Sequence, residues 1–290
     1  MITKGIILAG GNGTRLFPAT KAQSKQLLIV YDKPLIYYPL STLMLAGIRE
    51  ILIITTPQDS SNFRKLFGDG SHLGLNLQYA MQAQPNGIAE AFIIAEDFIG
   101  DDQVCLILGD NIFYGKLDFL RSAIANNRGG WIFGYNVQSP NNYGVVEIGK
   151  DNKVLSIEEK PIHPKSNYAI SGIYIFDSKV SEIAKSQQPS GRGELEITDI
   201  QKQYLQNNCL DITIMGRGIA WFDTGTPENL LEAGMFVRAI EKRQGRQIAC
   251  IEEIALNQNF ITLSDFNRII DSLPECDYKK YCQKIANEIE

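Results

Sequence analysis

With 290 residues, of which 44% are hydrophobic and 21% charged, the chain has the composition of a soluble globular protein. Its formal net charge of −5 argues against a general nucleic-acid-binding protein, and no apolar run reaches the roughly 18 residues that a membrane helix needs. Because the five cysteines show neither a CxxC pair nor a zinc-like spacing, we expect a cytoplasmic protein with reduced thiols and no contact with membranes or nucleic acid.

The first half of the chain alternates short apolar segments of strand length with helix-like segments. Strands are expected at residues 5–9, 50–56, 77–81 and 104–108, and helices at residues 39–46, 60–67 and 88–98. This alternation predicts an α/β protein with a mostly parallel, Rossmann-like central sheet and helices on both faces. Because such sheets place ligands at the carboxyl ends of their strands, the loops after the first and fourth strands should share one edge.

The rest of the chain changes character twice. Closely spaced strands are expected at residues 131–137, 145–148, 154–158 and 169–176, which predicts an added β-rich portion. A helix with a 3.6-residue apolar period is expected at 229–243, and further amphipathic helix at 260–290. We therefore expect a core at residues 1–226, divided near residue 115, and a helical segment at 227–290 for packing, oligomer contact or regulation.

A glycine-rich loop follows the first strand. Residues 10–16 read Gly-Gly-Asn-Gly-Thr-Arg-Leu, and Lys25 lies ten residues after Arg15. Glycines let the backbone approach an anion closely, and the two cations can neutralise phosphate oxygens. The loop is not a dinucleotide-binding loop, because Leu16 replaces its third glycine, and no Walker A string occurs. A phosphate site of another kind is expected, with a simple turn as the alternative.

Two aspartates stand at the ends of apolar segments. Asp110 follows the apolar strand that ends near residue 108, and Asp223 lies between bulky apolar residues and the start of a helix. Each aspartate could instead only cap a turn or a helix end. For the helix after Asp223, however, Thr226 before Pro227 is the better N-cap. Two carboxylates with few other ligands suit Mg²⁺, which keeps several waters and takes phosphate oxygens from a substrate.

The chain resembles the sugar-nucleotidyltransferases. The string LAGGxGTRLxPxT begins at residue 8, KQLLxVYDKPLIYYPL begins at residue 25, and YGVVE and EEKP follow at residues 143 and 158. The similarity extends from residue 4 to about residue 261. It implies transfer of a thymidylyl group from dTTP to α-D-glucose 1-phosphate, which gives dTDP-glucose and pyrophosphate and opens dTDP-rhamnose and polysaccharide synthesis. It also implies a Mg²⁺-assisted in-line displacement and a homo-tetramer.

The same resemblance assigns roles to individual residues. The catalytic positions are Arg15, Lys25, Asp110, Lys160 and Asp223, with the metal on Asp110 and Asp223. The nucleotide-binding positions are Leu8, Gly10, Gly11, Gly13, Thr14, Arg15, Lys25, Gln26, Gln82, Pro85, Gly87 and Asp110. The sugar-phosphate positions, which fall mostly in the β-rich portion, are Asn111, Tyr143, Gly144, Glu159, Lys160, Ile170, Arg192 and Trp221. Without a ligand, residues 158–160 could instead be an ordinary run of solvated charges. In the same way, Arg192 could be an arginine of a flexible loop that does not reach the sugar phosphate.

Gln82 is the residue expected to read the base. A carboxamide donates and accepts at once, and so satisfies the imide edge that uracil and thymine share. Only the space for one methyl group separates these bases, which discriminates by about 1–3 kcal/mol. A uridylyltransferase of the same fold is therefore the nearest alternative. A non-catalytic sugar-nucleotide sensor is a second one, and it should have lost Lys25 or an aspartate.

The resemblance also implies a regulatory nucleotide site at a subunit contact. Its possible members are Tyr114, Gly115, Arg217, Glu253 and Asn257. The family usually has an aromatic residue and then arginine where this chain has Leu256 and Asn257. An amide brings no charge, and charge-assisted hydrogen bonds are roughly twice as strong as neutral ones. The sequence therefore predicts weakened feedback regulation rather than none.

Overall fold

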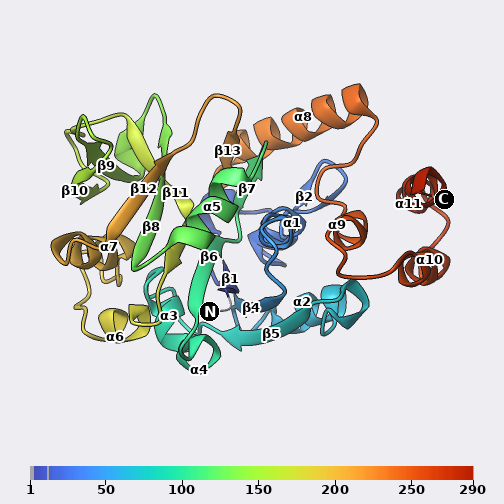
Figure 1. Cartoon of the computed structure of the whole chain (residues 1–290), viewed down its shortest axis with the longest axis horizontal. Coiled ribbons are helices and arrows are strands. Elements are labelled where there is room, and N and C mark those ends of the chain that lie inside the picture. The colour runs from blue at the N-terminus through green and yellow to red at the C-terminus, as the bar shows by residue number, and fades with distance from the viewer. Residues whose placement is uncertain (1–2, 12, 290) are drawn as a thin grey trace.

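The computed structural model of the chain describes residues 3–11 and 13–289 (Figure 1). Residues 1, 2, 12 and 290 lie outside this part, so Asn12 of the glycine-rich loop and Glu290 of the expected terminal helix are not described. Within the described residues, one nine-stranded sheet has the order β10-β9-β11-β6-β1-β4-β5; in addition β8 pairs with β11, and β12 pairs with β8.

The four strands that the sequence predicts in the first half are present and pair in parallel. They are β1 (Thr3–Ala9), β4 (Glu50–Thr55), β5 (Asn76–Met81) and β6 (Gln103–Leu108). β1 lies between β4 and β6, with Ile7 opposite Ile53 on one side and Ile107 on the other. The loops that follow β1 and β6 therefore begin at the same edge, as expected.

The strands of the middle portion extend this sheet. They are β8 (Gly130–Asn136), β9 (Gly144–Ile148), β10 (Val154–Glu159), β11 (Tyr168–Phe176) and β12 (Leu210–Ile214). β11 runs antiparallel to β6, β8 and β9, whereas β12 runs parallel to β8, so the sheet as a whole is mixed. Of the five, only β12 has no counterpart in the sequence-based prediction.

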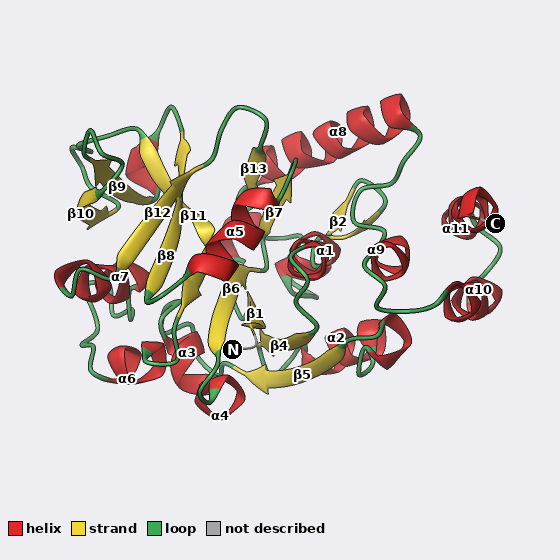
Figure 2. Ribbon diagram, in the orientation of Figure 1, coloured by secondary structure: helices red, strands yellow, loops and turns green. Residues whose placement is uncertain are grey.

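Helices cover both faces of the sheet, which confirms the α/β prediction (Figure 2). One face carries α1 (Tyr37–Leu45), α2 (Ser60–Phe67) and α5 (Asp118–Asn126). The other carries α3 (Glu90–Ile94), α4 (Glu96–Ile99), α6 (Val180–Lys185) and α7 (Ile197–Gln206). The helix expected at 88–98 is thus two short helices, because the backbone at Ala95 (φ −90°, ψ 7°) leaves the helical region.

The last part of the chain is helical. α8 (Pro227–Gln244) begins after Thr226, whose side chain accepts a hydrogen bond from the Asn229 amide, as an N-cap does. A small ribbon, β2 (Ile29–Val30) and β3 (Lys33–Pro34), lies against it. The chain ends in α9 (Ile251–Asn257), α10 (Leu263–Ser272) and α11 (Asp277–Ile289). None of the described helices is long and apolar enough to cross a membrane.

The further amphipathic helix expected at 260–290 is present as two helices, α10 and α11. α10 stops because Leu273 adopts an extended backbone (φ −72°, ψ 144°) immediately before Pro274. Proline disfavours the helical conformation in the residue that precedes it and cannot donate an amide hydrogen bond. The helical tail is therefore divided at Pro274.

Candidate active site

A two-stranded ribbon brings the two expected metal ligands together. β7 (Asn111–Tyr114) pairs antiparallel with β13 (Ala220–Asp223), which places Asp223 opposite Asn111. Just beyond the ribbon, the hydroxyl and the amide of Thr224 both donate to the Asp110 carbonyl oxygen, at 2.7 and 3.0 Å. Neither strand was predicted from the sequence. Their pairing nevertheless fixes the relative position of Asp110 and Asp223.

The two carboxylates have opposite electrostatic surroundings. Lys25 Nζ donates to one oxygen of Asp110, and Asn111 Nδ2 donates to the other at 3.0 Å. Burial alone would raise the pKa of Asp110, but the Lys25 ammonium and these hydrogen bonds hold it below its usual value. Burial, followed by the negative charge of Asp110, raises the pKa of Asp223 to about 6. A cation between the carboxylates would relieve this repulsion.

The donor set fits a magnesium ion held partly by substrate. Within residues 3–11 and 13–289, no group of three or more His, Cys, Asp or Glu side chains could hold a metal ion. The part of the chain that the structure describes thus offers two hard carboxylates and no complete set of metal ligands. Mg²⁺ is commonly bound by one or two carboxylates, several waters and substrate phosphates.

The glycine-rich loop carries a cation toward these aspartates. Gly13 has a left-handed backbone (φ +59°), and a Cβ there would lie 2.8 Å from Thr20 Cγ2. Two residues later, the Arg15 guanidinium lies against Gly225, where an added Cβ would be 2.6 Å from its Nη2. Because the Gly225 amide donates to Asp223 Oδ1 at 3.1 Å, Arg15 stands beside that carboxylate. Arg15 and Lys25 therefore converge on the aspartate pair.

Gln82 lies buried behind the same loop. Its Nε2 donates to the Gly87 carbonyl at 3.1 Å and to the Glu90 carboxylate at 2.7 Å. Its Oε1 faces Gly10, where an added Cβ would lie only 2.6 Å away. Both hydrogens of the Gln82 amide are therefore already used and, within the described part of the chain, only its oxygen is free to accept a hydrogen bond from a base. To donate to the base as well, as expected from the sequence, Gln82 must first break one of these two hydrogen bonds.

The remaining expected nucleotide-binding residues lie in the loop or beyond the neighbouring strand ends. Leu8, near the end of β1, accepts a hydrogen bond at its carbonyl from the Gly109 amide, at 2.9 Å. Gly11 is close to Lys25, since a Cβ there would meet Lys25 Cε at 3.7 Å. The others in this group are Thr14 and Gln26, each in a short 3₁₀ turn, and Pro85, exposed after β5.

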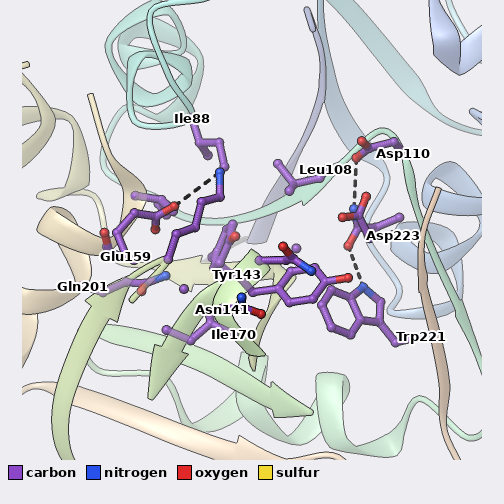
Figure 3. Close-up of a pocket in the computed structure, with 18 of the residues that line it drawn as sticks. Ile88, Leu108, Asp110, Asn141, Tyr143, Glu159, Ile170, Gln201, Trp221 and Asp223 are labelled. Carbon is purple, nitrogen blue, oxygen red and sulfur yellow. Dashed lines mark hydrogen bonds and ion pairs between the residues drawn. The ribbon is translucent and has the colours of Figure 1, made fainter. Parts of the chain in front are cut away.

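A cavity of about 520 Å³ opens beside the aspartates (Figure 3). Its wall contains most of the expected sugar-side residues, namely Asn111, Tyr143, Gly144, Glu159, Lys160, Ile170 and Trp221, together with Arg15, Asp110 and Asp223. Sequence reasoning missed Ile88, Leu108, Asn141, Asn142, Gly172, Tyr174, Ile197, Thr198 and Gln201. Several of these directly precede or follow a recognised motif, which is the signal that could have found them.

The aspartate end of the cavity is rigidly packed. Trp221 Nε1 donates to Asn111 Oδ1 at 2.6 Å, and the Trp221 ring lies 5.2 Å from the Tyr143 ring. The same Asn111 donates to Asp110 through its Nδ2. One asparagine thereby links the indole to the buried carboxylate, which fixes the orientation of both.

At the other end, charged groups are paired with one another. Lys160 Nζ lies 3.7 Å from Glu159 Oε1, and Lys160 has a left-handed backbone (φ 42°) that is uncommon for a non-glycine residue. Burial raises the pKa of the Glu159 carboxyl, and the Lys160 charge opposes that shift. Arg192 is not among the cavity-lining residues; its Nη2 lies 2.7 Å from Glu196 and 3.2 Å from Glu159.

The expected regulatory residues fall into two places. Gly115 (φ +134°) lies against the Gly218 carbonyl, beside Arg217. In the C-terminal helices, Glu253 accepts a 2.6 Å hydrogen bond from the Tyr281 hydroxyl, and Asn257 is exposed at the end of α9. Tyr114 is adjacent to Gly115 at the end of β7. The regulatory site stays a prediction.

The chain belongs to the nucleotidyl transferase family, whose model matches residues 4–240, so the resemblance read from the sequence is confirmed. It is 53% identical over 280 residues to a glucose-1-phosphate thymidylyltransferase of Neisseria gonorrhoeae, with 96% of this chain and 97% of that protein covered. A protein of the same name from Mycobacterium tuberculosis is 50% identical over 279 residues, covering 96% of this chain and 97% of its own.

Solved structures share the fold. One is a candidate glucose-1-phosphate thymidylyltransferase from Bacillus anthracis in complex with a sucrose, with a TM-score of 0.76 and 40% identity over 81% of this chain and 95% of that one. Another is a UDP-glucose pyrophosphorylase complexed with UDP-glucose, with a TM-score of 0.73 and 25% identity over 84% of this chain and all of that one.

Proposed function

We propose that this enzyme transfers a thymidylyl group from dTTP to α-D-glucose 1-phosphate, producing dTDP-glucose and pyrophosphate. The observation that carries the proposal is the position of Asp110 and Asp223, between two cations, Arg15 and Lys25, and a cavity lined by polar and aromatic side chains. The names of the similar proteins from Neisseria gonorrhoeae and Mycobacterium tuberculosis supply the substrates. This reaction supplies the activated sugar for dTDP-rhamnose and polysaccharide synthesis.

The reaction is a direct displacement at phosphorus. A phosphate oxygen of glucose 1-phosphate attacks the α-phosphorus of dTTP, and the bond from that phosphorus to the β-phosphate oxygen breaks. The electron pair leaves with pyrophosphate, so no protein nucleophile is required, and positioning and charge neutralisation provide the catalysis. Arg15 and Lys25 neutralise the triphosphate and the departing pyrophosphate. A Mg²⁺ ion held by Asp110 and Asp223 would supply Lewis-acid polarisation of the reacting phosphates.

The cavity holds the sugar phosphate. Glu159 accepts hydrogen bonds from sugar hydroxyls, and Lys160 neutralises the phosphate. Arg192 reaches the phosphate by exchanging a carboxylate partner, since Glu196, Glu159 and Glu194 now surround it. Residues 1–115 thus serve the nucleotide, residues 116–226 the sugar, and residues 227–290 packing or contact within a tetramer.

A uridylyltransferase is the second candidate. The similarity to a UDP-glucose pyrophosphorylase favours it, because the same fold there accompanies a uracil nucleotide. The edge that Gln82 faces is also common to uracil and thymine. A non-catalytic sensor is disfavoured, because Lys25, Asp110 and Asp223 are all present. Lys25 donates to Asp110, and Asp110 is close enough to Asp223 for its charge to raise the pKa of that carboxyl.

Pyrophosphate release tests the proposal. The enzyme is incubated with dTTP or UTP, each paired with glucose, galactose, mannose or N-acetylglucosamine 1-phosphate and Mg²⁺. The highest kcat/KM is expected for dTTP with glucose 1-phosphate, and the matched Asp110→Asn variant should be nearly inactive. Preference for UTP would make the second candidate the better description, and no release from any pair would contradict both.

A further inference from the structure

Gln201 stands in the cavity wall without an assigned role. It lies on α7, whose residues Ile197, Thr198 and Gln201 share one face and line the cavity, while Ile200 and Tyr204 pack into the core. Gln201 is fully buried. Figure 3 shows it on the side of the cavity away from Asp223 and Trp221. Because it stands on a packed helix, its amide is held at a defined place in the wall.

Both polar atoms of this amide lack a partner. In residues 3–11 and 13–289, neither Nε2 nor Oε1 of Gln201 makes a hydrogen bond. Leaving a buried polar group unpaired costs about 1–3 kcal/mol, so such groups are uncommon in folded proteins. The buried amides of Gln82 and Gln103 show the ordinary case, since each donates to two acceptors.

The place of Gln201 separates it from the other unpaired amides. Side-chain amide atoms of Gln187 and Gln247 also lack partners, but neither residue lines the cavity. An unpaired amide in a cavity wall can be satisfied by a ligand group that donates and accepts together. A sugar hydroxyl is such a group, and it is the chemical feature that distinguishes one hexose phosphate from another.

We infer that Gln201 is a specificity-determining residue that hydrogen-bonds one hydroxyl of the bound sugar. This inference rests on the proposed function, because it requires a sugar 1-phosphate in the cavity. A site built to bond a hydroxyl rejects the analogue that lacks it, since its own polar atoms are then buried unpaired. A sugar 1-phosphate that lacks this one hydroxyl should have a kcat/KM about tenfold to a hundredfold lower. This factor corresponds to the free-energy cost of leaving the buried amide unpaired.

The test combines a variant with a set of substrates. Gln201→Met keeps a similar length without the amide, and Gln203→Met is the control, because Gln203 lies on the same helix and outside the cavity wall. Both variants and the unaltered enzyme are assayed for pyrophosphate release with dTTP and glucose 1-phosphate or its 2-, 3-, 4- and 6-deoxy analogues. The unaltered enzyme should lose activity with an analogue at the position that Gln201 bonds.

In Gln201→Met, kcat/KM for glucose 1-phosphate should fall by the same factor, and the penalty for that one deoxy position should disappear while the other three remain. Gln203→Met should retain all four penalties. If Gln201→Met also keeps all four penalties unchanged, the inference is overturned and the proposed function stands. If the unaltered enzyme releases no pyrophosphate from dTTP and glucose 1-phosphate, the proposed function fails and the inference fails with it.

Thermal melting without substrate gives a second readout. Replacing an unpaired buried amide by an apolar side chain of similar length should raise the melting temperature of Gln201→Met above that of the unaltered enzyme. Gln203→Met should change it little. A lower melting temperature for Gln201→Met would mean that folding itself uses the amide, which would overturn its assignment to the sugar.

Discussion

At one end of the site, the exposed Arg15 follows a glycine-rich turn and joins the mostly buried Lys25; at the other end, buried hydrogen-bonding groups lie on regular strands and a helix. Arg15 follows the left-handed Gly13, whereas Gln201 is fully buried on α7. The first arrangement suits phosphates, which are recognised by charge and by backbone amides. The second suits hydroxyl groups, which are recognised by direction and shape. Substitutions at the two ends should therefore differ in size and in the substrate that they affect.

The largest effect is expected where the two ends meet. Asp110→Asn and Asp223→Asn each remove a hard anionic ligand from a site that has few others, and each should lower kcat about 10²-fold or more. The measurement is pyrophosphate release over a Mg²⁺ titration. Near-normal activity of either variant at limiting Mg²⁺ would show that its aspartate only caps the local backbone.

Melting in metal-free buffer at pH 7 separates the two aspartates. Asp110→Asn should lower the melting temperature, because it leaves the Lys25 ammonium, with a side chain only 13% exposed, without its carboxylate. Asp223→Asn should raise it. Burial and the charge of Asp110 raise the pKa of Asp223 to about 6 in the folded chain, so at pH 7 the carboxylate is ionised there at a free-energy cost that is absent in the unfolded chain, and the neutral amide removes that cost. Equal shifts in one direction would contradict the opposite surroundings described for the two carboxylates.

The two lysines should divide the substrates between the ends. Lys25→Ala should mainly raise the KM for dTTP, and Lys160→Ala the KM for glucose 1-phosphate, each by about tenfold, since each removes one charge-assisted contact. Initial rates with one substrate varied and the other saturating give the separate constants. If both variants change the KM values for both substrates equally, the assignment of Lys25 to the nucleotide and Lys160 to the sugar phosphate is contradicted.

A smaller effect tests how the loop orients Gln82. Gly10→Ala would place a Cβ 2.6 Å from Gln82 Oε1, and should raise the KM for dTTP by several-fold to about tenfold. Gly11→Ala is the matched control, because its Cβ would make only an ordinary 3.7 Å contact with Lys25 Cε. The glucose 1-phosphate constants should hardly change in either variant. If Gly11→Ala raises the KM for dTTP as much as Gly10→Ala does, the effect comes from a change in the loop backbone and not from displacement of Gln82.

The smallest effect concerns regulation away from both ends. Asn257 is exposed on α9 and brings no charge, so inhibition by dTDP-rhamnose should be mostly competitive with dTTP. Asn257→Arg should strengthen any non-competitive part. Strong non-competitive inhibition of the unaltered enzyme would show that other groups, such as Arg217, replace the missing cation.

The loop end could be predicted from the sequence because its parts are contiguous. Gly10 to Leu16 form one string, and parallel strands bring Asp110 to the same edge by geometry alone. At the cavity end, the resemblance to the family names seven of the lining residues as sugar-phosphate positions, but the residues alone do not predict that they meet, since the wall is drawn from distant segments joined by β7 and β13, strands of four residues each. Nothing in the sequence indicates a role for Gln201, because a buried glutamine on an amphipathic helix cannot be told from a surface glutamine without the structure. The apolar periodicity predicts a helical tail, but periodicity does not show the break before Pro274.

The central claim is that the two substrates meet at Asp110 and Asp223 and react directly with each other. The stereochemical course at phosphorus tests it. The enzyme is given dTTP with a chiral α-thio phosphate and glucose 1-phosphate, and the configuration of the thio-dTDP-glucose is determined. A single displacement predicts inversion at the α-phosphorus. Net retention, or a nucleotidyl group trapped on the protein, would contradict direct reaction and require a nucleophile on the chain.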